Sequence, residues 1–573
     1  MKDEILKGFI SSFSESNGYH GLPEDVIFER FANFNTISKL YPRDFNIEDL
    51  STGGENDIAI DGMAIIVNGT IIRNKEEIDF LRHSNGVLDV TFAFVQSKNS
   101  EAFRGEQVGN FIFGVKSFFD NDPSIPENDD IQLLRSLKEH IYSCSIDFDI
   151  PPLLKLFFVT RGQWKEPEPI IGKVRRELSE LDSRNLFRNS AEIEFYDAER
   201  LKSTYRELSR KSVKEIPFNN HVSLPDMPAQ LNVRQSFIGS ISASNYIDLI
   251  TNSDGELSKW LFYDNVRHFQ GHNKVNMEID ETLKDMHLQC LLPLLNNGIT
   301  IIAKKVDKVG SKLKLTDFQI VNGCQSSHIL YQNRNSLSQD SHIVVKVIET
   351  NEQEVINKII RATNRQTEVK DEAFESLKPF HKDLEEFFKA KESAVRNPIY
   401  YERRSKEYLG NPKVASYQVV TLAALIKAHV AIVFEQPQST HRYFGELLDS
   451  NKKSLFTTTN NLAQYYTSAF IMNRIEHLFK QRILLKAYKQ FKYHVAFLVY
   501  LIMQDKYRNT DALILSIDDD SILRDACIQA CKVIGKSRSR IGLSDADASR
   551  NRDFTTAIKN NILVKIEKEK SRV

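Results

Sequence analysis

An acidic residue, an amide and a lysine lie at the ends of two apolar segments in the first hundred residues. Asp61 belongs to the segment 57–66, and Gln96 and Lys98 close the segment 88–98. The period of two in a strand places Gln96 and Lys98 on the same side as several apolar side chains, where a core strand normally carries neither. An acid on one strand followed by (Asp/Glu/Gln)-x-Lys on the next is the arrangement of a metal-dependent phosphodiesterase site.

These residue types suit phosphodiester cleavage. Mg²⁺ or Mn²⁺ prefers oxygen ligands, which the carboxylate of Asp61 and the side-chain carbonyl of Gln96 supply, and a bound divalent cation lowers the pKa of water. Lys98 beside the cation would stabilise charge on the attacking hydroxide or on phosphate oxygens. Glu29 on an expected first helix and Gln107 near the start of the helix after the strand are accessory candidates for the same pocket.

A second acid, Asp57, competes with Asp61 for the acidic position. Asp57 can instead cap the start of the strand, and the glycine that follows Asp61 favours Asp61. The pattern as a whole also fits a strand end exposed to solvent, with a lysine in an ordinary ion pair. The sequence therefore predicts Asp61, Gln96 and Lys98 as the catalytic core, with Asp61 and Gln96 as the metal ligands.

The elements around these residues alternate between strand and helix. Such alternation predicts an α/β domain with a mixed sheet flanked by helices. The turn dipeptide Asn68-Gly69 opens the insertion between the first two strands. The expected elements are largely helical residues 1–45, strands at 57–67 and 88–97, a helix at 106–119, and strands at 153–159 and 193–196.

The length of 573 residues is too great for one core and predicts several domains. Three prolines lie between 216 and 230, which we interpret as a linker. After it, strands and helices mix up to about residue 415, and the remainder is mostly helical. The predicted domains are 1–215 (nuclease-like), 231–415 (an α+β middle domain) and 416–573 (a helical C-terminal region).

The net charge of -1 conceals an asymmetry. Residues 391–573 contain 30 Lys and Arg against 18 Asp and Glu, a surplus of 12 positive charges. This surplus indicates either a polyanionic partner such as nucleic acid or docking onto the acidic remainder of the chain. The five scattered cysteines, the absence of a signal peptide and the absence of a long apolar run predict a cytoplasmic protein without membrane spans.

Asparagine and glutamine are concentrated in four segments of the middle region, at 265–267, 296–300, 319–326 and 362–366. Asn-Gly is a turn dipeptide and buried amides often tie loops to strands, so each segment alone reads as structural. Together they supply many donors and acceptors for a base edge or a phosphate. The candidate nucleic-acid or ligand-binding residues are Arg267, Asn297, Asn322, Gln325, Asn364, Arg365 and Gln366.

The order of these segments resembles the AIPR family of abortive phage resistance proteins. The resemblance covers residues 231–415. Its blocks are N-x-R at Asn265, N-x-x-I-x-x-T-L at Asn276, N-N-G-I-T at Asn296, Q-I-V-N-G-x-Q at Gln319, A-T-N-x-Q at Ala362 and Y-Y-E-R-R at Tyr400. The last block adds Arg403 and Arg404 to the binding candidates. Ser326 stands where the family usually has Thr, and Leu294-Leu295 stand where an aromatic residue is common.

The N-terminal pattern resembles the PD-(D/E)xK restriction-endonuclease-like superfamily. Asp61 matches its Asp and Lys98 its Lys, while the neutral Gln96 replaces the usual acid, which weakens metal binding. The two resemblances imply a bacterial anti-phage nuclease that cleaves DNA in preference to RNA. Because an enzyme of this type endangers its own host, we expect its activity to be gated by dimerisation to a homodimer, by modified DNA, by a partner from the defence system or by a phage trigger. One alternative is a non-catalytic nucleic-acid-binding or sensor module in which Gln96 marks a decayed site. Another is a purely structural scaffold for defence partners, which would bind neither metal nor nucleic acid.

Overall fold

The computed structural model divides by its internal contacts into two compact units. The first unit comprises residues 1–31, 73–80 and 374–573, and the second comprises 32–72 and 81–373. The division at 373/374 lies upstream of the boundary expected near 415. The structure describes residues 3–570 except 42–44, 121, 124, 149, 210–212, 253–254, 256, 263–279, 286–287, 364–374, 377, 404–406, 409–410, 412, 458 and 508.

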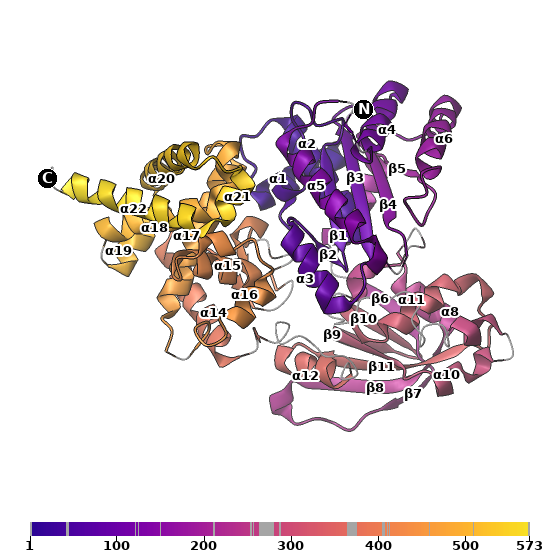
Figure 1. Cartoon of the computed structure of the whole chain (residues 1–573). Helices are drawn as coiled ribbons and strands as arrows, with labels where there is room; N and C mark the ends of the chain where they lie inside the picture. Colours follow the sequence, from indigo (N-terminus) through magenta and orange to yellow (C-terminus); the bar gives the residue numbers. More distant parts are fainter. Residues whose placement is uncertain are drawn as a thin grey trace. The chain divides into compact units, whose positions relative to one another are not determined.

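A five-stranded mixed sheet in the second unit carries the candidate catalytic residues (Figure 1). Its strand order is β2-β1-β3-β4-β5; β1 is antiparallel to β2 and β3, whereas β3, β4 and β5 are parallel. The mixed sheet expected from the sequence is therefore present. The strands are β1 (Gly62–Val67), β2 (Thr70–Ile71), β3 (Val90–Lys98), β4 (Leu153–Thr160) and β5 (Ile193–Tyr196).

Aromatic side chains join this sheet to its helices. Phe94 on β3 packs edge-on against Phe118 of α4 (Gly105–Phe118), with ring centroids 5.3 Å apart. Phe92 stacks on Tyr142 of α5 (Asp129–Ser143) at 6.0 Å. Helix α6 (Glu168–Asp182) packs on α4, where Lys116 binds Glu177 and Glu180. The other helices in this half of the chain are α1 (Glu4–Asn17), α2 (Glu24–Leu40), α3 (Lys75–Asn85) and α7 (Ala198–Ser209).

A six-stranded sheet forms the rest of the second unit, in the order β6-β10-β9-β11-β8-β7. Its two edge strands occupy part of the segment interpreted as a linker. Pro217 ends one of them, which is a position that an edge strand tolerates. The strands are β6 (Val213–Pro217), β7 (Asn220–Ser223), β8 (Val233–Ser242), β9 (Ile299–Val309), β10 (Lys312–Asn322) and β11 (His342–Thr350). The helices are α8 (Ala243–Ile250), α10 (Leu292–Leu295), α11 (Cys324–Gln332) and α12 (Gln353–Thr363).

The C-terminal part of the first unit is almost entirely helical, as expected. A short parallel pair of strands, β12 (Tyr400–Glu402) and β13 (Val419–Thr421), precedes most of its helices. The helices are α14 (Pro379–Lys391), α15 (Leu422–Ile432), α16 (Phe444–Ser450), α17 (Leu462–Lys480), α18 (Lys492–Lys506), α19 (Thr510–Asp518), α20 (Asp520–Ile541), α21 (Asp545–Arg550) and α22 (Arg552–Lys570).

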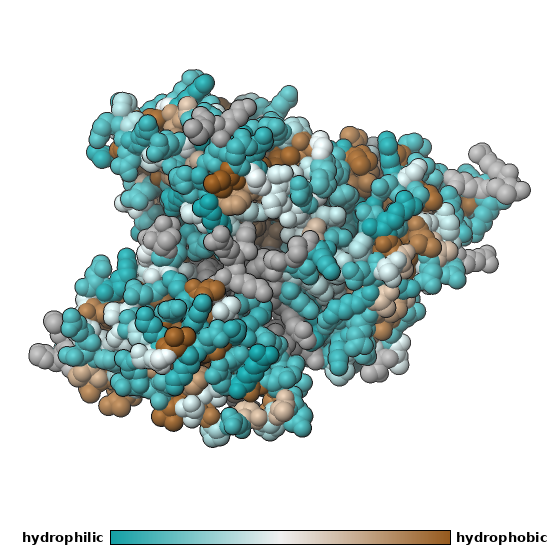
Figure 2. All heavy atoms as spheres, turned by 180° about the vertical axis from the view of Figure 1, so that it is seen from behind, coloured by the Kyte–Doolittle hydropathy of each residue, from teal (hydrophilic) through white to brown (hydrophobic). Residues whose placement is uncertain are grey.

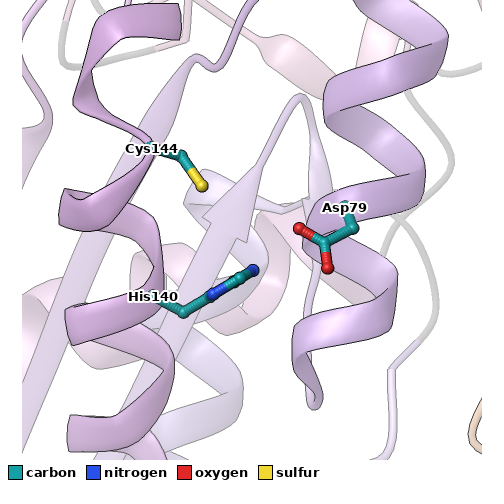
Figure 3. Close-up of side chains that lie close together, drawn as sticks. All are labelled: Asp79, His140 and Cys144. Carbon is teal, nitrogen blue, oxygen red and sulfur yellow. The ribbon is translucent and has the colours of Figure 1, made fainter.

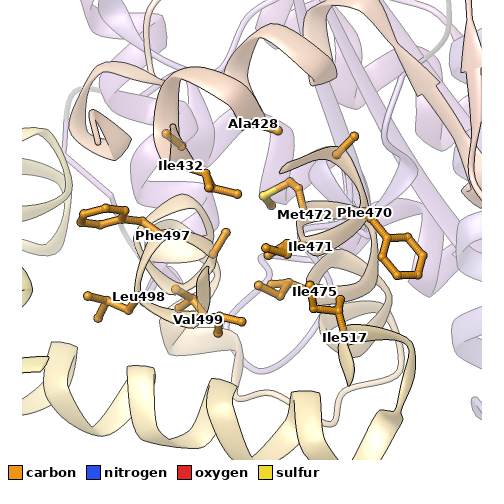
Figure 4. Packing of buried hydrophobic residues seen from close by; sticks show 14 of the residues in the cluster. Ala428, Ile432, Phe470, Ile471, Met472, Ile475, Phe497, Leu498, Val499 and Ile517 are labelled. Atoms are coloured by element: carbon orange, nitrogen blue, oxygen red, sulfur yellow. The ribbon is translucent and has the colours of Figure 1, made fainter. Parts of the chain in front are cut away.

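Apolar side chains of α15, α17, α18 and α19 form one core in this helical region (Figure 4). Ile432 of α15, Ile471 and Ile475 of α17, and Val499 of α18 belong to it. Each is at most 1% exposed, and full burial of such a side chain contributes roughly 1.5–3 kcal/mol. This core holds together helices that are far apart in the sequence.

Two histidines are buried among these helices and make the region sensitive to acid. Burial lowers the pKa of His429 and of His494 to about 3. The folded state favours the neutral imidazole of each histidine. The unfolding free energy is therefore highest above pH 6.5 and decreases as pH falls from 6.5 towards 3.

We expect His429→Phe to flatten this dependence, since phenylalanine keeps the stacking of position 429 on Tyr465 and does not titrate. Between pH 7.5 and 5.5 the variant should lose about 1.4 kcal/mol less unfolding free energy than the wild type. Chemical denaturation followed by circular dichroism measures this difference. Identical pH profiles would contradict it.

The surface is mostly hydrophilic in the view of Figure 2, with small separate hydrophobic areas. Within the described ranges, no helix is both long enough and apolar enough to cross a membrane.

None of the five cysteines forms a disulfide. Cys144, Cys324, Cys527 and Cys531 are buried, and Cys290 is exposed.

Candidate active site

A tight turn delivers Asp61 to the start of β1. Asn56, Ile58 and Ala59 all have positive φ (57°, 50° and 58°), a conformation that non-glycine residues adopt at a cost. Asp57 holds this turn, because its Oδ1 accepts a hydrogen bond from Ala59 N at 2.9 Å. The carboxylate of Asp57 is thus used locally, and the strand expected from residue 57 begins only at Gly62. Of the two acids, Asp61 is the one that lies against β3.

Hydrogen bonds fix the carboxylate of Asp61 against the end of β3. Asp61 Oδ2 accepts hydrogen bonds from Ser97 N at 2.7 Å, Gln96 Nε2 at 2.8 Å and Ser97 Oγ at 3.0 Å. The backbone continues the pairing, since Asp61 N donates to Val95 O at 2.9 Å. All three side-chain contacts end on Oδ2, and Oδ1 accepts no hydrogen bond from any residue that the structure describes. The structure thus brings Asp61 and Gln96 together.

Lys98 adds a positive charge to this group of residues. It is partly buried at the end of β3, two residues after Gln96 and on the same side of the strand. Burial raises the pKa of the Asp61 carboxyl above its ordinary value, and the Lys98 ammonium and the hydrogen bonds from Ser97 only partly offset this. Asp61 is 9% exposed, so its negative charge is costly unless a cation faces it.

We expect Asp61→Asn to stabilise the metal-free protein at neutral pH. A carboxyl with a raised pKa binds its proton more tightly in the folded state, so stability falls as pH rises from the unfolded value through the folded pKa. Asparagine removes this penalty. The midpoint of thermal unfolding in EDTA should therefore be higher than that of the wild type at pH 7.5, and the difference should shrink at pH 4.

Asp57→Asn is the matched control, because the Asp57 carboxylate accepts the hydrogen bond of Ala59 N and its like charge is the smallest of the causes that act on the Asp61 pKa. It should raise the midpoint less than Asp61→Asn does. A lower midpoint for Asp61→Asn than for the wild type at pH 7.5 would contradict the penalty at Asp61.

Unsatisfied amide oxygens lie beside Asp61. Gln96 Oε1 and Asn33 Oδ1 are buried without a hydrogen-bond partner, and both residues are 0% exposed. Asn33, on α2, donates from Nδ2 to the carbonyl of Asp61 at 3.5 Å. A Cβ on Gly62 would lie 2.1 Å from Asn33 Oδ1, so only glycine fits there. Carboxylate and amide oxygens are the ligands that Mg²⁺ prefers, and this donor set fits a divalent cation.

The accessory residues are less closely tied to this group. Asn33 was not predicted; it follows Glu29 by one helical turn, and that spacing was the available signal. Glu29 belongs to the first unit and Asp61 to the second, so the structure does not assign Glu29 to the site. Gln107 on α4 has a buried Oε1 without a partner, but no hydrogen bond joins it to Asp61 or Gln96. Ser97, also not predicted, makes two of the three contacts to Asp61.

Two of the amide-rich segments meet in the second unit. Asn296 Nδ2 donates to Ser326 Oγ at 2.8 Å, and its Oδ1 accepts from Gly298 N at 2.9 Å. These contacts tie the start of β9 to α11 and give this asparagine a structural role. Of the predicted binding residues, Asn297 is exposed, and Asn322 and Gln325 are partly buried. Arg267, Asn364, Arg365, Gln366 and Arg404 lie outside the described residues, as do Asn265, Asn276 and Ile279.

Arg403 lies in a buried charged cluster of the first unit. Its Nε donates to Glu385 Oε2 at 2.6 Å, and its side chain is only 12% exposed. Burial alone would raise the pKa of Glu385, but hydrogen bonds from Lys389 and Arg403 lower it below its ordinary value. Nearby, Tyr401 and His381 are joined by a hydrogen bond of 2.8 Å. Arg403 is therefore engaged within the fold, and its contact with nucleic acid stays a prediction.

His140 and Cys144 lie one turn apart at the end of α5 (Figure 3). Cys144 Sγ accepts a hydrogen bond from Arg82 Nη1 at 3.5 Å, and Arg82 also pairs with Asp147. Asp79, drawn in the same figure, belongs to the first unit. A histidine and a cysteine alone fall short of the four ligands of a structural zinc site, so this pair carries no metal assignment.

The second half of the chain matches a known protein family. The model of the AIPR protein family matches residues 262–540. This stretch is similar to the AIPR family, and we call it the AIPR region. It begins at the end of the first 3-10 turn after α8 and runs to the end of α20, so it extends well beyond the interval 231–415 on which the resemblance was based. No curated protein and no solved structure matches the chain.

Proposed function

We propose that this AIPR protein is a divalent-metal-dependent nuclease of an anti-phage abortive-infection system, acting on DNA in preference to RNA. The observation that carries the proposal is the pairing of Asp61 with Gln96 at adjoining strand ends, 2.8 Å apart, with Lys98 on the same strand. A buried carboxylate with one unoccupied oxygen, unsatisfied amide oxygens and a lysine together form a cation site next to an anion site. The AIPR region supports the defence role.

Each residue has a distinct part in this proposal. Asp61 Oδ1 and Gln96 Oε1 would hold Mg²⁺ or Mn²⁺, which when bound supplies a water of lowered pKa and positive charge against the scissile phosphate. Lys98 stabilises the negative charge that develops on the phosphate oxygens. Ser97 orients the Asp61 carboxylate, and Asn33 holds the backbone of Asp61 from α2.

The remaining chain would supply binding and control. The surplus of positive charge after residue 390 would hold the nucleic-acid backbone, whose phosphates dominate affinity. A nuclease endangers its own cell, so we propose that dimerisation, a defence partner or a phage trigger gates its activity.

The same pair of residues also favours a second candidate, a non-catalytic nucleic-acid sensor. Gln96 Nε2 donates directly to Asp61 Oδ2 and so satisfies that oxygen without a cation. A glutamate in its place would repel Asp61 and require a cation between the two carboxylates. In this reading the glutamine has replaced metal binding by a hydrogen bond.

Cleavage of plasmid DNA, single-stranded DNA and RNA with Mg²⁺ or Mn²⁺ tests the proposal. We expect cleavage by the wild type and none above background by Lys98→Ala. Equal residual cleavage in both proteins would reveal a contaminant. A wild type that neither cleaves nor gains thermal stability from Mg²⁺ or Mn²⁺ would leave the sensor as the better assignment.

A further inference from the structure

The last turns of α20 present three positively charged side chains to solvent. Lys532, Lys536 and Arg540 are all exposed and follow one another at intervals of four residues. This interval places them along one face of the helix, with a rise of about 6 Å from each residue to the next. We call these three residues the α20 basic row.

The positive charges of this row are not neutralised within the described fold. None of its three members forms an ion pair with a residue that the structure describes. Two nearby cations differ in this respect. Arg538 of α20 pairs with Asp545 at 2.6 Å, and Lys559 of α22 pairs with Glu435. The row is therefore the part of this surface that is left to attract a negatively charged partner.

Acidic side chains are absent from both helices around the row. Helix α20 has no Asp or Glu from residue 526 to 541, and α22 has none from 554 to 566. The two helices pack together (Figure 1), and Asn561 Nδ2 of α22 donates to Ser537 Oγ of α20 at 3.0 Å. The surface of these two segments therefore carries positive charge and no negative charge.

The stability of the helix does not account for the whole row. Cations near the C-terminus of a helix interact favourably with the helix dipole, but this effect falls off within the last turn. Arg540 lies in that turn, whereas Lys532 and Lys536 lie before it. Like charges four residues apart on a helix repel each other, so the row destabilises the free chain. A partner of opposite charge would relieve this repulsion.

We propose that the α20 basic row binds the phosphate backbone of DNA. The row extends over about 12 Å from Lys532 to Arg540, so one small anion would reach only part of it, whereas a backbone offers a series of negative charges. Lysine and arginine contact phosphates without reading the base sequence. This inference rests on the proposed function and assigns its binding step to named residues, but that binding can be measured without cleavage.

Fluorescence anisotropy of a labelled DNA duplex, titrated with the full chain in EDTA at several NaCl concentrations, tests the row. The logarithm of the association constant falls linearly with the logarithm of salt concentration, by about 0.9 for each contacted phosphate. Joint replacement of Lys532, Lys536 and Arg540 by alanine should therefore reduce this slope by about 2–3 units and weaken binding at low salt by about tenfold or more. Alanine favours a helix, so the exposed replacements leave α20 folded, which circular dichroism checks.

A variant with the same loss of charge is the matched control. Lys312, Lys382 and Lys453 are exposed, lie on other elements and form no ion pair within the part of the chain that the structure describes. Their joint replacement by alanine should change the slope by less than about one unit, the share of one phosphate. Binding of DNA by the row variant like that of the wild type, or an equal loss in the control, would overturn the proposal.

The two proposals fail in different ways. Binding that depends on the row, without cleavage in Mg²⁺ or Mn²⁺, would support the row and count against the nuclease. Cleavage by a chain whose DNA binding does not depend on the row would support the nuclease and overturn the row. A wild type that binds phosphatidylserine vesicles but not DNA would also overturn the proposal, since the row would then serve an anionic lipid surface.

Discussion

Lys98→Ala should lower the rate of phosphodiester cleavage by about 10²–10³-fold, which is typical for the loss of one group that stabilises transition-state charge. Lys98 is partly buried and forms no direct ion pair with any residue that the structure describes. The positive charge of Lys98 lowers the pKa of Asp61 and so partly offsets the effect of burial. The effect should appear in kcat, measured as initial cleavage rates at saturating DNA and Mg²⁺.

Lys155→Ala is the control for this measurement. It removes the same side chain from the neighbouring strand β4, where Lys155 pairs with Glu194 at 3.0 Å. Loss of that partly exposed pair should cost at most about 1 kcal/mol of stability and leave cleavage unchanged. Equal losses of rate in the two variants would remove Lys98 from the reaction.

Gly114→Ala should destabilise the protein by about 2 kcal/mol, although alanine normally favours a helix. A Cβ on Gly114 of α4 would lie 1.8 Å from the carbonyl oxygen of Ile58. That atom belongs to the backbone of the strained turn before Asp61, so the turn or the helix must move. We therefore expect a lower thermal midpoint and, because Asp61 follows the turn directly, weaker metal-dependent stabilisation.

Gly172→Ala is the opposite case on α6. Nothing lies within 4 Å of a Cβ there, so alanine should stabilise the helix by about 0.5–1 kcal/mol. Differential scanning calorimetry of both variants gives the comparison. A shift of the same sign in both would show that the contact between α4 and the turn does not govern stability.

Local pattern was sufficient for the strands that carry the candidate site. The apolar alternation of 88–98 predicted β3, and the order of acid, amide and lysine predicted the meeting of Asp61 with Gln96. The sequence left two roles open for Asp57, a local cap or the catalytic acid. The turn geometry decides for the cap, because the Asp57 carboxylate accepts a hydrogen bond from Ala59 N.

Contacts between distant segments were beyond the reach of that pattern. Asn33 acts on Asp61 only because α2 crosses beside β1, and a helix gives no sequence signal for which turn meets a strand end. The prolines at 217 and 225 indicated a linker, yet the segment 213–223 pairs at both edges of a sheet, where proline is permitted. The engagement of Arg403 with Glu385 likewise depends on helix packing.

The distribution of cysteines has a practical consequence for following this protein in solution. Burial raises the pKa of Cys324 and of Cys531 to about 12, and Cys144 and Cys527 are buried as well. The exposed thiol of Cys290 therefore offers a thiol-directed dye or spin label one preferred attachment point on the native chain. A reporter can be placed within the AIPR region without introducing or removing a single residue.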